Sequence, residues 1–388
     1  MSAASRLNAL DLSLNELLSS AIGSVYSAAA VEVRQGGQVM YVREFGRLDP
    51  EGSPDQGTPT TRATLFDLAS LTKLFTTTAF FKLVEAGHVK IDTPLIDVLP
   101  EFNGLRSIRP YPHPLNTGEQ VAIVPPTDDQ FDASTVSFRH LLTHSSGLPA
   151  WLNLRDAPDK ASRLAMCLDT PFAYPPGTRV VYSDVGFILL GLALERLMGA
   201  PLDEVMRTQV IGPLDLDARY GVIVENVAPT EFCQWRQRRV IGEVHDENSA
   251  ALGGVAGHAG LFGTARDVAI LGQVYLDSAA EVASAEIVRR PAFIDPPIAQ
   301  EATHRQIEDR GLGWMLRSLS GPTSSGHYFS ANSYGHTGFV GTSLWVDPAR
   351  ELVCTLLTNN VFYGRDKDAI IKFRPLFHDT VIEALERG

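Results

Sequence analysis

The chain has 388 residues, of which 44% are hydrophobic, and it carries a formal net charge of −12. This length and composition are sufficient to bury one large core or two joined cores. The acidic balance argues against nucleic acid or an anionic membrane surface as a partner, because both would repel the protein. A small molecule is therefore the expected partner, and the sequence leaves the oligomeric state open.

The cysteines and the N-terminal sequence indicate the cellular compartment in which the protein works. Cys167, Cys233 and Cys354 are too few and too scattered for a disulfide framework, and none has the C-x-x-C spacing of a zinc or redox site. We expect them to be buried and reduced. The N-terminus lacks a basic segment followed by a continuous apolar stretch, and no later segment is apolar over enough residues to span a bilayer. The expected location is cytoplasmic, although a trimmed exported form would have the same pattern.

The first part of the chain predicts a helix followed by a β-hairpin. Leucines at positions 7, 10, 14, 17 and 18 repeat at helical spacing, and Gly23 offers a stop. Residues 28–34 and 38–45 are β-type runs that flank two glycines at 36–37. This is the pattern of two strands joined by a tight turn.

A loop and a helix follow the hairpin. Residues 47–64 are rich in Pro, Gly, Asp and Thr and predict a loop. Residues 71–86 show helical periodicity that ends at Gly87, which places Ser70 at the start of a helix. Residues 101–136 are rich in proline and have few periodic apolar residues, so we interpret them as a long surface excursion. Further helices are expected at 137–143, 160–167 and 185–198.

After about residue 310 the pattern changes to short β-type runs. The segments "GLGWMLR", "GTSLWVDP" and "ELVCTLLTNNV" are separated by turn residues, and residues 366–387 are again helical, with a bend at Pro375. The predicted fold is α/β (α+β): an antiparallel sheet built from both termini and flanked by helices, with an inserted, mostly helical domain. We assign the sheet domain to 1–66 and 270–388 and the inserted domain to 67–269, with a cleft between them.

The segment "FDLASLTKLF" (66–75) places Ser70 and Lys73 three residues apart at the predicted helix start. Residues at this spacing share one helix face, so the lysine can reach the serine oxygen. A serine hydroxyl becomes a good nucleophile when a neighbouring base takes its proton, and a helix N-terminus stabilises the resulting anion. The lysine must then be neutral for part of the time, which burial favours. A surface Ser and Lys is the alternative for so short a motif.

Two further stretches strengthen the prediction of nucleophilic catalysis. In "PPGTRVVYSDVGF" (175–187), Tyr182 lies at a turn between a β-type run and a buried helix, where a phenol can project into a cleft. In "GHTGFVGTSLWV" (335–346), the His336–Gly338 triplet precedes a strand, and its glycine lets a substrate approach the backbone. Each stretch alone is more often structural.

Together the three motifs resemble the serine β-lactamase-like hydrolase family, which comprises class C β-lactamases, D-alanyl-D-alanine carboxypeptidases and other penicillin-binding proteins, and β-lactamase-like carboxylesterases. That family carries S-x-x-K, Y-x-N or a variant, and K-T-G or H-T-G, in this order. The resemblance covers most of the chain from about residue 28 onward. Flanking segments that share it are "HLLTHSSGLP" (140–149), "YPPGTRVVYSD" (174–184), "GGVAGHAGLFGTARDVA" (253–269), "GLGWML" (311–316) and "LLTNNV" (356–361).

The resemblance implies a role for each matching residue. Ser70 would be the acyl-accepting nucleophile, Lys73 its proton partner, and Tyr182 a general base that also protonates the leaving group. The backbone N–H groups of Ser70 and Phe339 would form the oxyanion hole. The remaining implied substrate-binding residues are Asp184, His336, Thr337, Gly338 and His258, the last on the Gly257–Gly260 wall of the cleft.

Two residues depart from the family pattern. Asp184 stands where Y-x-N enzymes have an amide, and a carboxylate cannot donate a hydrogen bond to a substrate carbonyl unless it is protonated. We expect it to pair with Lys73 instead. His336 replaces the lysine of K-T-G, so a positive charge exists there only when the imidazole is protonated. Both changes weaken the case for a dedicated β-lactamase and leave ester cleavage unaffected.

Other chemistries lack their motifs. The sequence has no G-x-S-x-G, no G-x-x-x-x-G-K-[ST], no G-x-G-x-x-G and no H-E-x-x-H. "VHDEN" (244–248) with His258 offers metal-ligand residue types, but its spacing matches no ligand pattern and a polar loop accounts for it. His140 and His144 are expected to cap or cross-link their own turn. We expect neither a metal nor a cofactor.

The sequence therefore predicts a serine hydrolase that works through a covalent acyl-enzyme. β-Lactams and small carboxylic esters are the leading substrates, ahead of D-amino-acid peptides. An acyltransferase that passes the acyl group to an alcohol or amine is a second hypothesis. A non-catalytic penicillin-binding or assembly protein is a third, against which the intact Ser70, Lys73 and Tyr182 argue.

Overall fold

The computed structural model describes residues 3–49, 57–116, 118–281, 292–321 and 323–387. The helices are α1 (Ala3–Ser20), α2 (Thr72–Glu85), α3 (Phe138–Leu142), α4 (Lys160–Asp169), α5 (Asp184–Met198), α6 (Leu202–Met206), α7 (Glu247–Ala251), α8 (Ala265–Glu281), α9 (Pro296–Thr303) and α10 (Asp368–Arg387). The longer strands are β1 (Ala28–Gln35), β2 (Gln38–Gly46), β4 (Leu105–Ile108), β7 (Thr127–Asp132), β12 (Tyr334–Thr337), β13 (Ser343–Asp347) and β14 (Leu352–Thr358). Two-residue strands are β3 (Phe66–Asp67), β5 (Tyr111–Pro112), β6 (Gln120–Val121), β8 (Phe232–Cys233), β9 (Arg238–Arg239), β10 (Phe262–Gly263) and β11 (Met315–Leu316).

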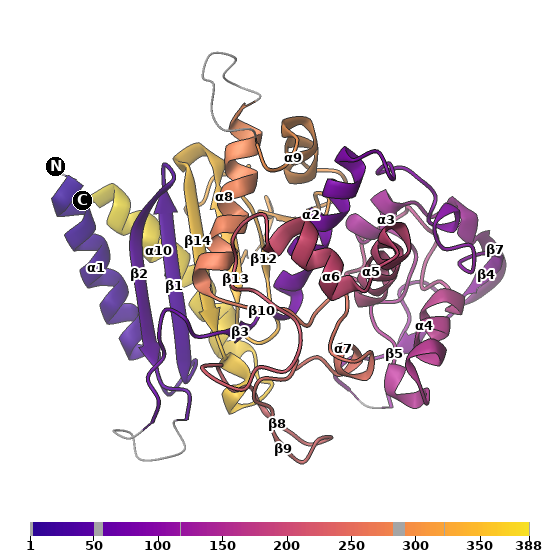
Figure 1. The fold of residues 1–388 in the computed structure, drawn as a ribbon, viewed down its shortest axis with the longest axis horizontal. Coiled ribbons are helices and arrows are strands. Elements are labelled where there is room, and N and C mark those ends of the chain that lie inside the picture. The colour runs from indigo at the N-terminus through magenta and orange to yellow at the C-terminus, as the bar shows by residue number, and fades with distance from the viewer. Residues whose placement is uncertain (1–2, 50–56, 117, 282–291, 322, 388) are drawn as a thin grey trace.

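The main sheet has six strands in the order β11-β12-β13-β14-β1-β2, and every neighbouring pair is antiparallel. The N-terminal hairpin completes a sheet whose other strands come from the last quarter of the chain, as Figure 1 shows. The predicted sheet from both termini, flanked by helices, is confirmed. The boundaries assigned to the two domains stay predictions.

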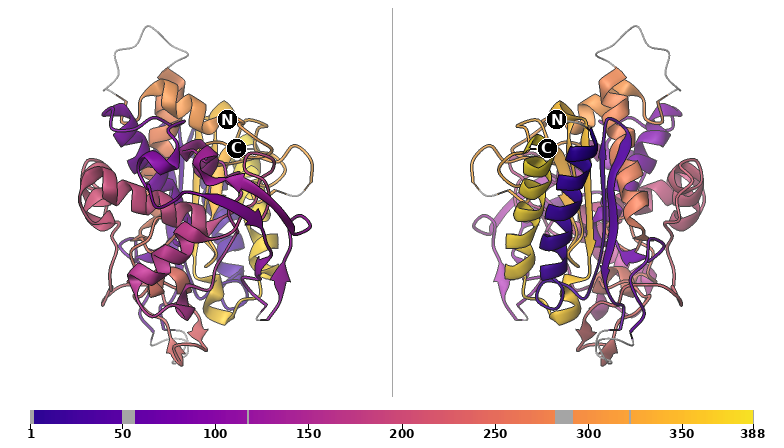
Figure 2. Two further views of the ribbon diagram at one scale, coloured as in Figure 1. Left: turned by 90° about the vertical axis from the view of Figure 1, so that its right-hand side faces the viewer. Right: turned by 90° about the vertical axis from the view of Figure 1, so that its left-hand side faces the viewer.

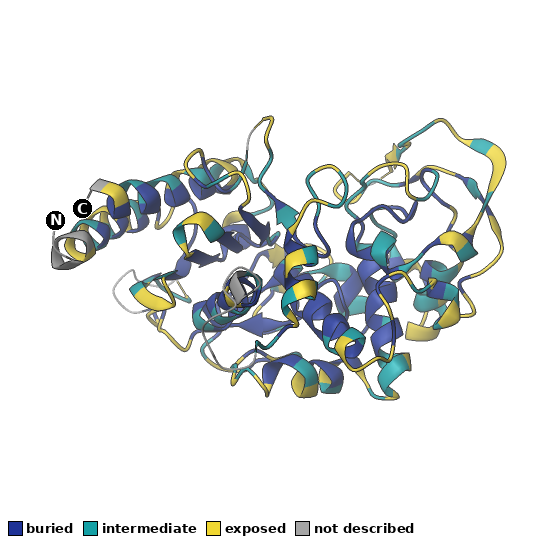
Figure 3. Cartoon of the chain, turned by 90° about the horizontal axis from the view of Figure 1, so that it is seen from above, coloured by how far each residue is buried: buried dark blue, intermediate teal, exposed yellow. Residues whose placement is uncertain are grey.

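Strand β1 lies between β14 and β2 and is buried on both faces, because successive side chains point to opposite sides. Ala28 and Ala30 join the core that continues into the helical region, whereas Val31 and Val33 pack beneath α1 and α10. Those two helices lie side by side over one face of the sheet, and α8 covers the other (Figures 1 and 2). Figure 3 shows that the buried residues follow the sheet and the inner sides of the helices.

The predicted helices and hairpin occur close to their expected positions. The sequence left the conformation of residues 101–136 open, and the structure forms two small two-stranded sheets there, β4 with β7 and β5 with β6. These strands are two to six residues long and only partly buried, and they lack the apolar alternation that marks a strand in a sequence.

The three cysteines are buried and unpaired, as predicted. Among the described residues, no single helix is long and apolar enough to cross a membrane. α5 and the segment Leu202–Ile211 are long and apolar enough only when they are taken together, and the chain bends by 79° between them.

Candidate active site

Ser70 lies in a short 3-10 turn, Ala69–Leu71, that leads directly into α2. Ala69 has a φ of 46°, in the left-handed region that non-glycine residues rarely adopt. The buried carboxylate of Asp67 holds this turn: one oxygen accepts the Ala69 N–H at 2.8 Å and the other accepts the His245 N–H at 2.6 Å. A strained backbone conformation persists where the surrounding structure holds it in place. Here the strained turn places Ser70 at the start of α2.

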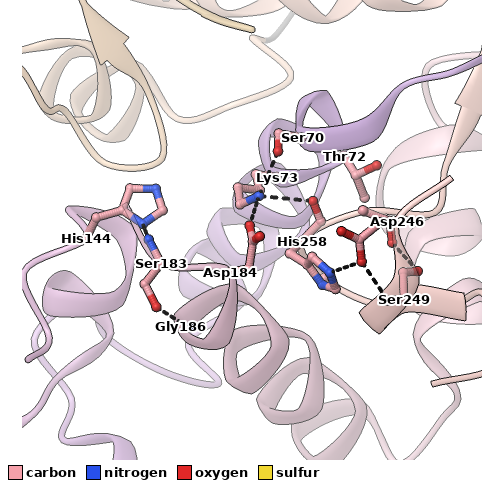
Figure 4. A network of polar contacts seen from close by, with 12 residues as sticks. Ser70, Thr72, Lys73, His144, Ser183, Asp184, Gly186, Asp246, Ser249 and His258 are labelled. Carbon is pink, nitrogen blue, oxygen red and sulfur yellow. Dashed lines mark hydrogen bonds and ion pairs between the residues drawn. The ribbon is translucent and has the colours of Figure 1, made fainter. Parts of the chain in front are cut away.

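Lys73 connects Ser70 to two other segments of the chain. Its fully buried ammonium Nζ lies 3.0 Å from Ser70 Oγ, 2.7 Å from Asp184 Oδ1 and 3.1 Å from the His258 carbonyl oxygen (Figure 4). Asp184 is the first residue of α5, so the contact joins the two helices. The predicted pairing of Asp184 with Lys73 is confirmed.

The charge of Lys73 is set by this pairing. Burial lowers the pKa of the ammonium, but the neighbouring Asp184 carboxylate and Tyr182 outweigh burial and raise the pKa above its usual value. The sequence led us to expect a lysine that burial keeps partly neutral. In the resting site Lys73 is instead an ammonium, and it can act as a base only after it passes a proton to its partner.

Tyr182 lies above this pair. The Lys73 ammonium is 4.8 Å from the centre of the phenol ring, and the Tyr182 hydroxyl is buried without a hydrogen-bond partner among the described residues. Burial raises the pKa of the phenol, which Lys73 partly offsets. Tyr182 is therefore a neutral phenol that holds a proton beside Ser70, with its hydroxyl available for a substrate.

His144 positions Tyr182, a role that the sequence did not reveal. Its ring packs 4.5 Å from the Tyr182 ring, and its Nδ1 accepts the Ser183 N–H at 3.0 Å (Figure 4). The expectation that His144 serves only its own turn is wrong, because this bond reaches a segment 39 residues away. His140 does cap its own helix, α3, together with Ser137, as predicted.

His336 and Thr337 lie at the end of β12, as the H-T-G motif implied. His336 is buried, and burial together with the nearby Lys73 and Arg310 charges lowers its pKa to about 3. Its Nδ1 bonds the Thr337 carbonyl at 2.9 Å, and its Nε2 has no partner among the described residues. A neutral imidazole cannot supply the charge that the lysine of K-T-G would carry.

The next two residues lie close to the serine. A side chain at Gly338 would meet the Thr342 hydroxyl at 2.0 Å and the Leu68 carbonyl at 2.8 Å, so only glycine fits. Among the hydrogen bonds of the described residues, none is donated by the Phe339 N–H. This free donor has the property that an oxyanion hole requires.

His258 reaches the site mainly through its backbone carbonyl. Its imidazole is buried and its Nε2 contacts Asp246 Oδ1 at 2.8 Å, while Asp246 also caps α7 (Figure 4). The segment "VHDEN" thus builds the start of a helix and a buried contact. No group of three or more potential metal-ligating side chains gathers in the part of the chain that the structure describes.

The cleft has two lobes that share Ser70, Tyr182 and Phe339. The cationic lobe, of about 320 Å³, is bordered by Arg310, His336, Thr337, Gly338, Lys367 and Arg374. The acidic lobe, of about 130 Å³, is bordered by Leu115, Trp151, Asp184, Asp246, Glu247 and His258. A larger cavity, of about 790 Å³, lies against α8 and α9 and includes none of the predicted site residues.

The structure brings all the predicted site residues together. Lys73 lies beneath the cleft and reaches Ser70, and the others border one lobe or both. Sequence reasoning missed the three charged residues Arg310, Lys367 and Arg374. It also missed Leu115, although "PHPLN" at 112–116 is a turn-rich segment inside the excursion whose role was left open.

Comparison with known proteins identifies the family. The profile described as Beta-lactamase matches residues 22–374. The chain belongs to the Beta-lactamase family. An Escherichia coli K12 relative, named provisionally as a D-alanyl-D-alanine carboxypeptidase, is 29% identical over 389 residues, which is 91% of this chain and 82% of the relative.

Solved structures show a similar fold. One is EstCE1, a hydrolase with promiscuous acyltransferase activity, with a TM-score of 0.69, 21% identity, and coverage of 95% of this chain and 99% of that one. Another is a mutant simvastatin synthase from Aspergillus terreus, with a TM-score of 0.70, 17% identity, and coverage of 97% and 95%. At these identities the likeness concerns the fold.

Proposed function

We propose that the protein is a serine hydrolase that forms a covalent acyl-enzyme on Ser70. The observation that carries the proposal is the 3.0 Å contact between Ser70 Oγ and Lys73 Nζ, held by Asp184 at 2.7 Å. Lys73 is thus in hydrogen-bond reach of both the nucleophile and the group that orients the lysine. Membership of the Beta-lactamase family supports the same chemistry.

The proton route follows from the resting charges. Lys73 passes a proton to Asp184, and the neutral amine then takes the Ser70 proton as Oγ bonds to the substrate carbonyl carbon. The Ser70 and Phe339 N–H groups receive the oxyanion. The Tyr182 phenol gives its proton to the leaving atom as the carbonyl–leaving-group bond breaks, and Lys73 returns a proton to Tyr182. Water repeats the sequence on the acyl-enzyme and releases the acid.

Small esters and short peptides are the proposed substrates, ahead of β-lactams. The E. coli relative is named provisionally as a D-alanyl-D-alanine carboxypeptidase, which supports a peptide. Asp184 holds Lys73 where a β-lactam-recognising site would offer an amide donor, which disfavours β-lactams. These compounds share an acyl carbon open to attack by Ser70, and they differ in the leaving group.

An acyltransferase is the second candidate. One protein of similar fold is described as a hydrolase with promiscuous acyltransferase activity, and another as a simvastatin synthase. In an acyltransferase, an alcohol or amine takes the place of water. Adding an acceptor alcohol during ester turnover separates the candidates. A transferase makes new ester at the expense of free acid, whereas a hydrolase makes free acid in unchanged amount.

The intact mass of wild type and of Ser70→Ala, measured after brief exposure to a p-nitrophenyl ester and to a chromogenic β-lactam, tests the proposal. We expect an adduct of the acyl mass on wild type alone, with colour release that is faster for the ester. Equal labelling of both proteins, or turnover by Ser70→Ala, would exclude Ser70 as the nucleophile.

A further inference from the structure

The cavity of about 790 Å³ against α8 and α9 is separate from the cleft at Ser70. Its border combines those two helices with the start of β12 and the turns that join β1 to β2 and β13 to β14 (Figure 1). Among the described residues, it shares no lining residue with either lobe of the cleft. Sites for small organic ligands in proteins commonly have this volume. The cavity can therefore hold an organic molecule independently of Ser70.

Gln273 and Asp277 lie one turn apart on the same face of α8, and both border the cavity. The Gln273 Nε2 donates to Asp277 Oδ1 at 2.8 Å. Because a carboxylate only accepts hydrogen bonds, this contact fixes the orientation of the amide and leaves its oxygen unused. Gln273 is 8% exposed, and its Oε1 has no partner among the described residues. An unpaired buried carbonyl is costly, so a ligand that donates to it would be favoured.

Tyr334, the first residue of β12, brings a second unpaired polar group to the same cavity. Its side chain is buried, and its hydroxyl has no hydrogen-bond partner among the described residues. The ring packs edge-on against Trp314, with 5.0 Å between the ring centres, which fixes its direction. Burial raises the pKa of the phenol, and Tyr275 and Asp277 raise it further. The hydroxyl is therefore neutral and lies near the Asp277 carboxylate.

The charged groups on the border differ in how far they are already satisfied. Asp277 and Glu351 are exposed carboxylates, and neither forms an ion pair with another described residue. The Arg305 guanidinium donates to two backbone carbonyls, and His304 Nδ1 donates to the Gln300 carbonyl at 2.5 Å. The negative groups are thus the ones that remain available to a ligand, and they favour a cation.

We propose that this cavity is a second ligand site, which binds a small aliphatic primary amine in its ammonium form. An ammonium has three N–H donors, and the acceptors that face it are the Gln273 carbonyl, the Asp277 carboxylate and the Tyr334 hydroxyl. Leu276 and Leu316 also border the cavity and give the hydrocarbon chain an apolar surface. The inference does not depend on the reaction in the cleft.

Three probes of equal chain length test the class of ligand by titration calorimetry on the full chain. They are 1-aminopentane, 1-pentanol and pentanoate, at pH 7 and constant low ionic strength. The amine is protonated there, because an alkyl ammonium such as that of lysine has a pKa of about 10.4. We expect the amine to bind about tenfold more tightly than the alcohol, from charge-assisted hydrogen bonds, and the pentanoate to bind more weakly than either.

Asp277→Asn is the decisive variant, since the asparagine oxygen can still accept the Gln273 hydrogen bond and only the charge is lost. It should weaken amine binding about tenfold and leave the alcohol unchanged. Tyr334→Phe, which keeps the buried ring, should weaken amine binding about threefold. Asp295→Asn is the matched control, because Asp295 is an exposed aspartate just before α9 that does not border the cavity. It should bind the amine as wild type does.

Equal affinity for amine and alcohol would overturn the inference. So would pentanoate binding as tight as that of the amine, because Arg305 would then set the charge preference. Amine binding that is undiminished in Asp277→Asn, in a chain that melts normally, would place the amine elsewhere, such as the acidic lobe of the cleft, and would also overturn it. Ser70→Ala should bind the amine like wild type, so the site stands or falls separately from the proposed function.

Discussion

Two lysines from different parts of the chain lie at the cleft around Ser70, and their surroundings give them different charges; Lys73 is fully buried and Lys367 is partly buried. Burial lowers the pKa of both. Lys73 has a carboxylate at 2.7 Å, and its pKa is raised; Lys367 has two arginines nearby instead, and its pKa falls to about 7. The comparison shows that the neighbouring charged groups, rather than burial, decide whether a lysine in this cleft stays protonated or titrates near neutral pH.

Removing Lys73 should have the largest effect. Lys73→Met leaves Ser70 without a proton acceptor and Asp184 without its ion pair, so we expect kcat/KM for a p-nitrophenyl ester to fall about 10²- to 10⁴-fold. Steady-state colour release measures it, with Lys372→Met, which changes an exposed lysine of α10, as the control. A loss below about threefold, at unchanged melting temperature, would contradict the assignment of Lys73 as the proton partner.

Asp184→Asn would make the surroundings of Lys73 resemble those of Lys367. Without the carboxylate, burial dominates and the pKa of Lys73 should drop. Asp184→Asn also removes the group to which Lys73 passes its proton, so the lysine must lose that proton to solvent. We therefore expect kcat/KM to gain a rise with pH that wild type lacks, while its plateau falls about ten- to a hundredfold because the lysine loses its orientation. A pH–rate profile measures both. An unmoved profile would show that Asp184 does not control the lysine.

His336→Gln should have the smallest effect. The histidine has a pKa of about 3 and is neutral throughout the working range, so its loss should remove one hydrogen bond and no charge. We expect kcat/KM to drop about threefold and the shape of the pH profile between pH 5 and pH 8 to persist. Disappearance of an inflection in that range would show that His336 titrates in catalysis.

Much of the fold and the central site could be predicted from the sequence, because their signals are local. The S-x-x-K pair, the tyrosine at a turn and the alternating strands each lie within a few residues. The pairing of Asp184 with Lys73 was also predictable from chemistry, since a carboxylate cannot replace an amide donor.

The rest depends on residues that are distant in the sequence. The neutrality of His336 follows from burial and from Lys73 and Arg310, and no local pattern carries that information. Lys367 lies in a polar segment just before a helix, and no sequence motif distinguishes it from an ordinary surface lysine. The strands within 101–136 are too short to show periodicity. The domain boundaries and the cytoplasmic location stay predictions.

The position of β1 in the sheet has a consequence for how the chain folds. Its two partners are β2, which follows immediately, and β14, which is about three hundred residues later. A ribosome completes the hairpin early, but one edge of β1 has no partner until β14 has also been made. Closing so long a loop is entropically costly and slow. The nascent hairpin is therefore an exposed strand edge during synthesis, and the protein depends on late docking of its C-terminal strands and helix to protect that edge.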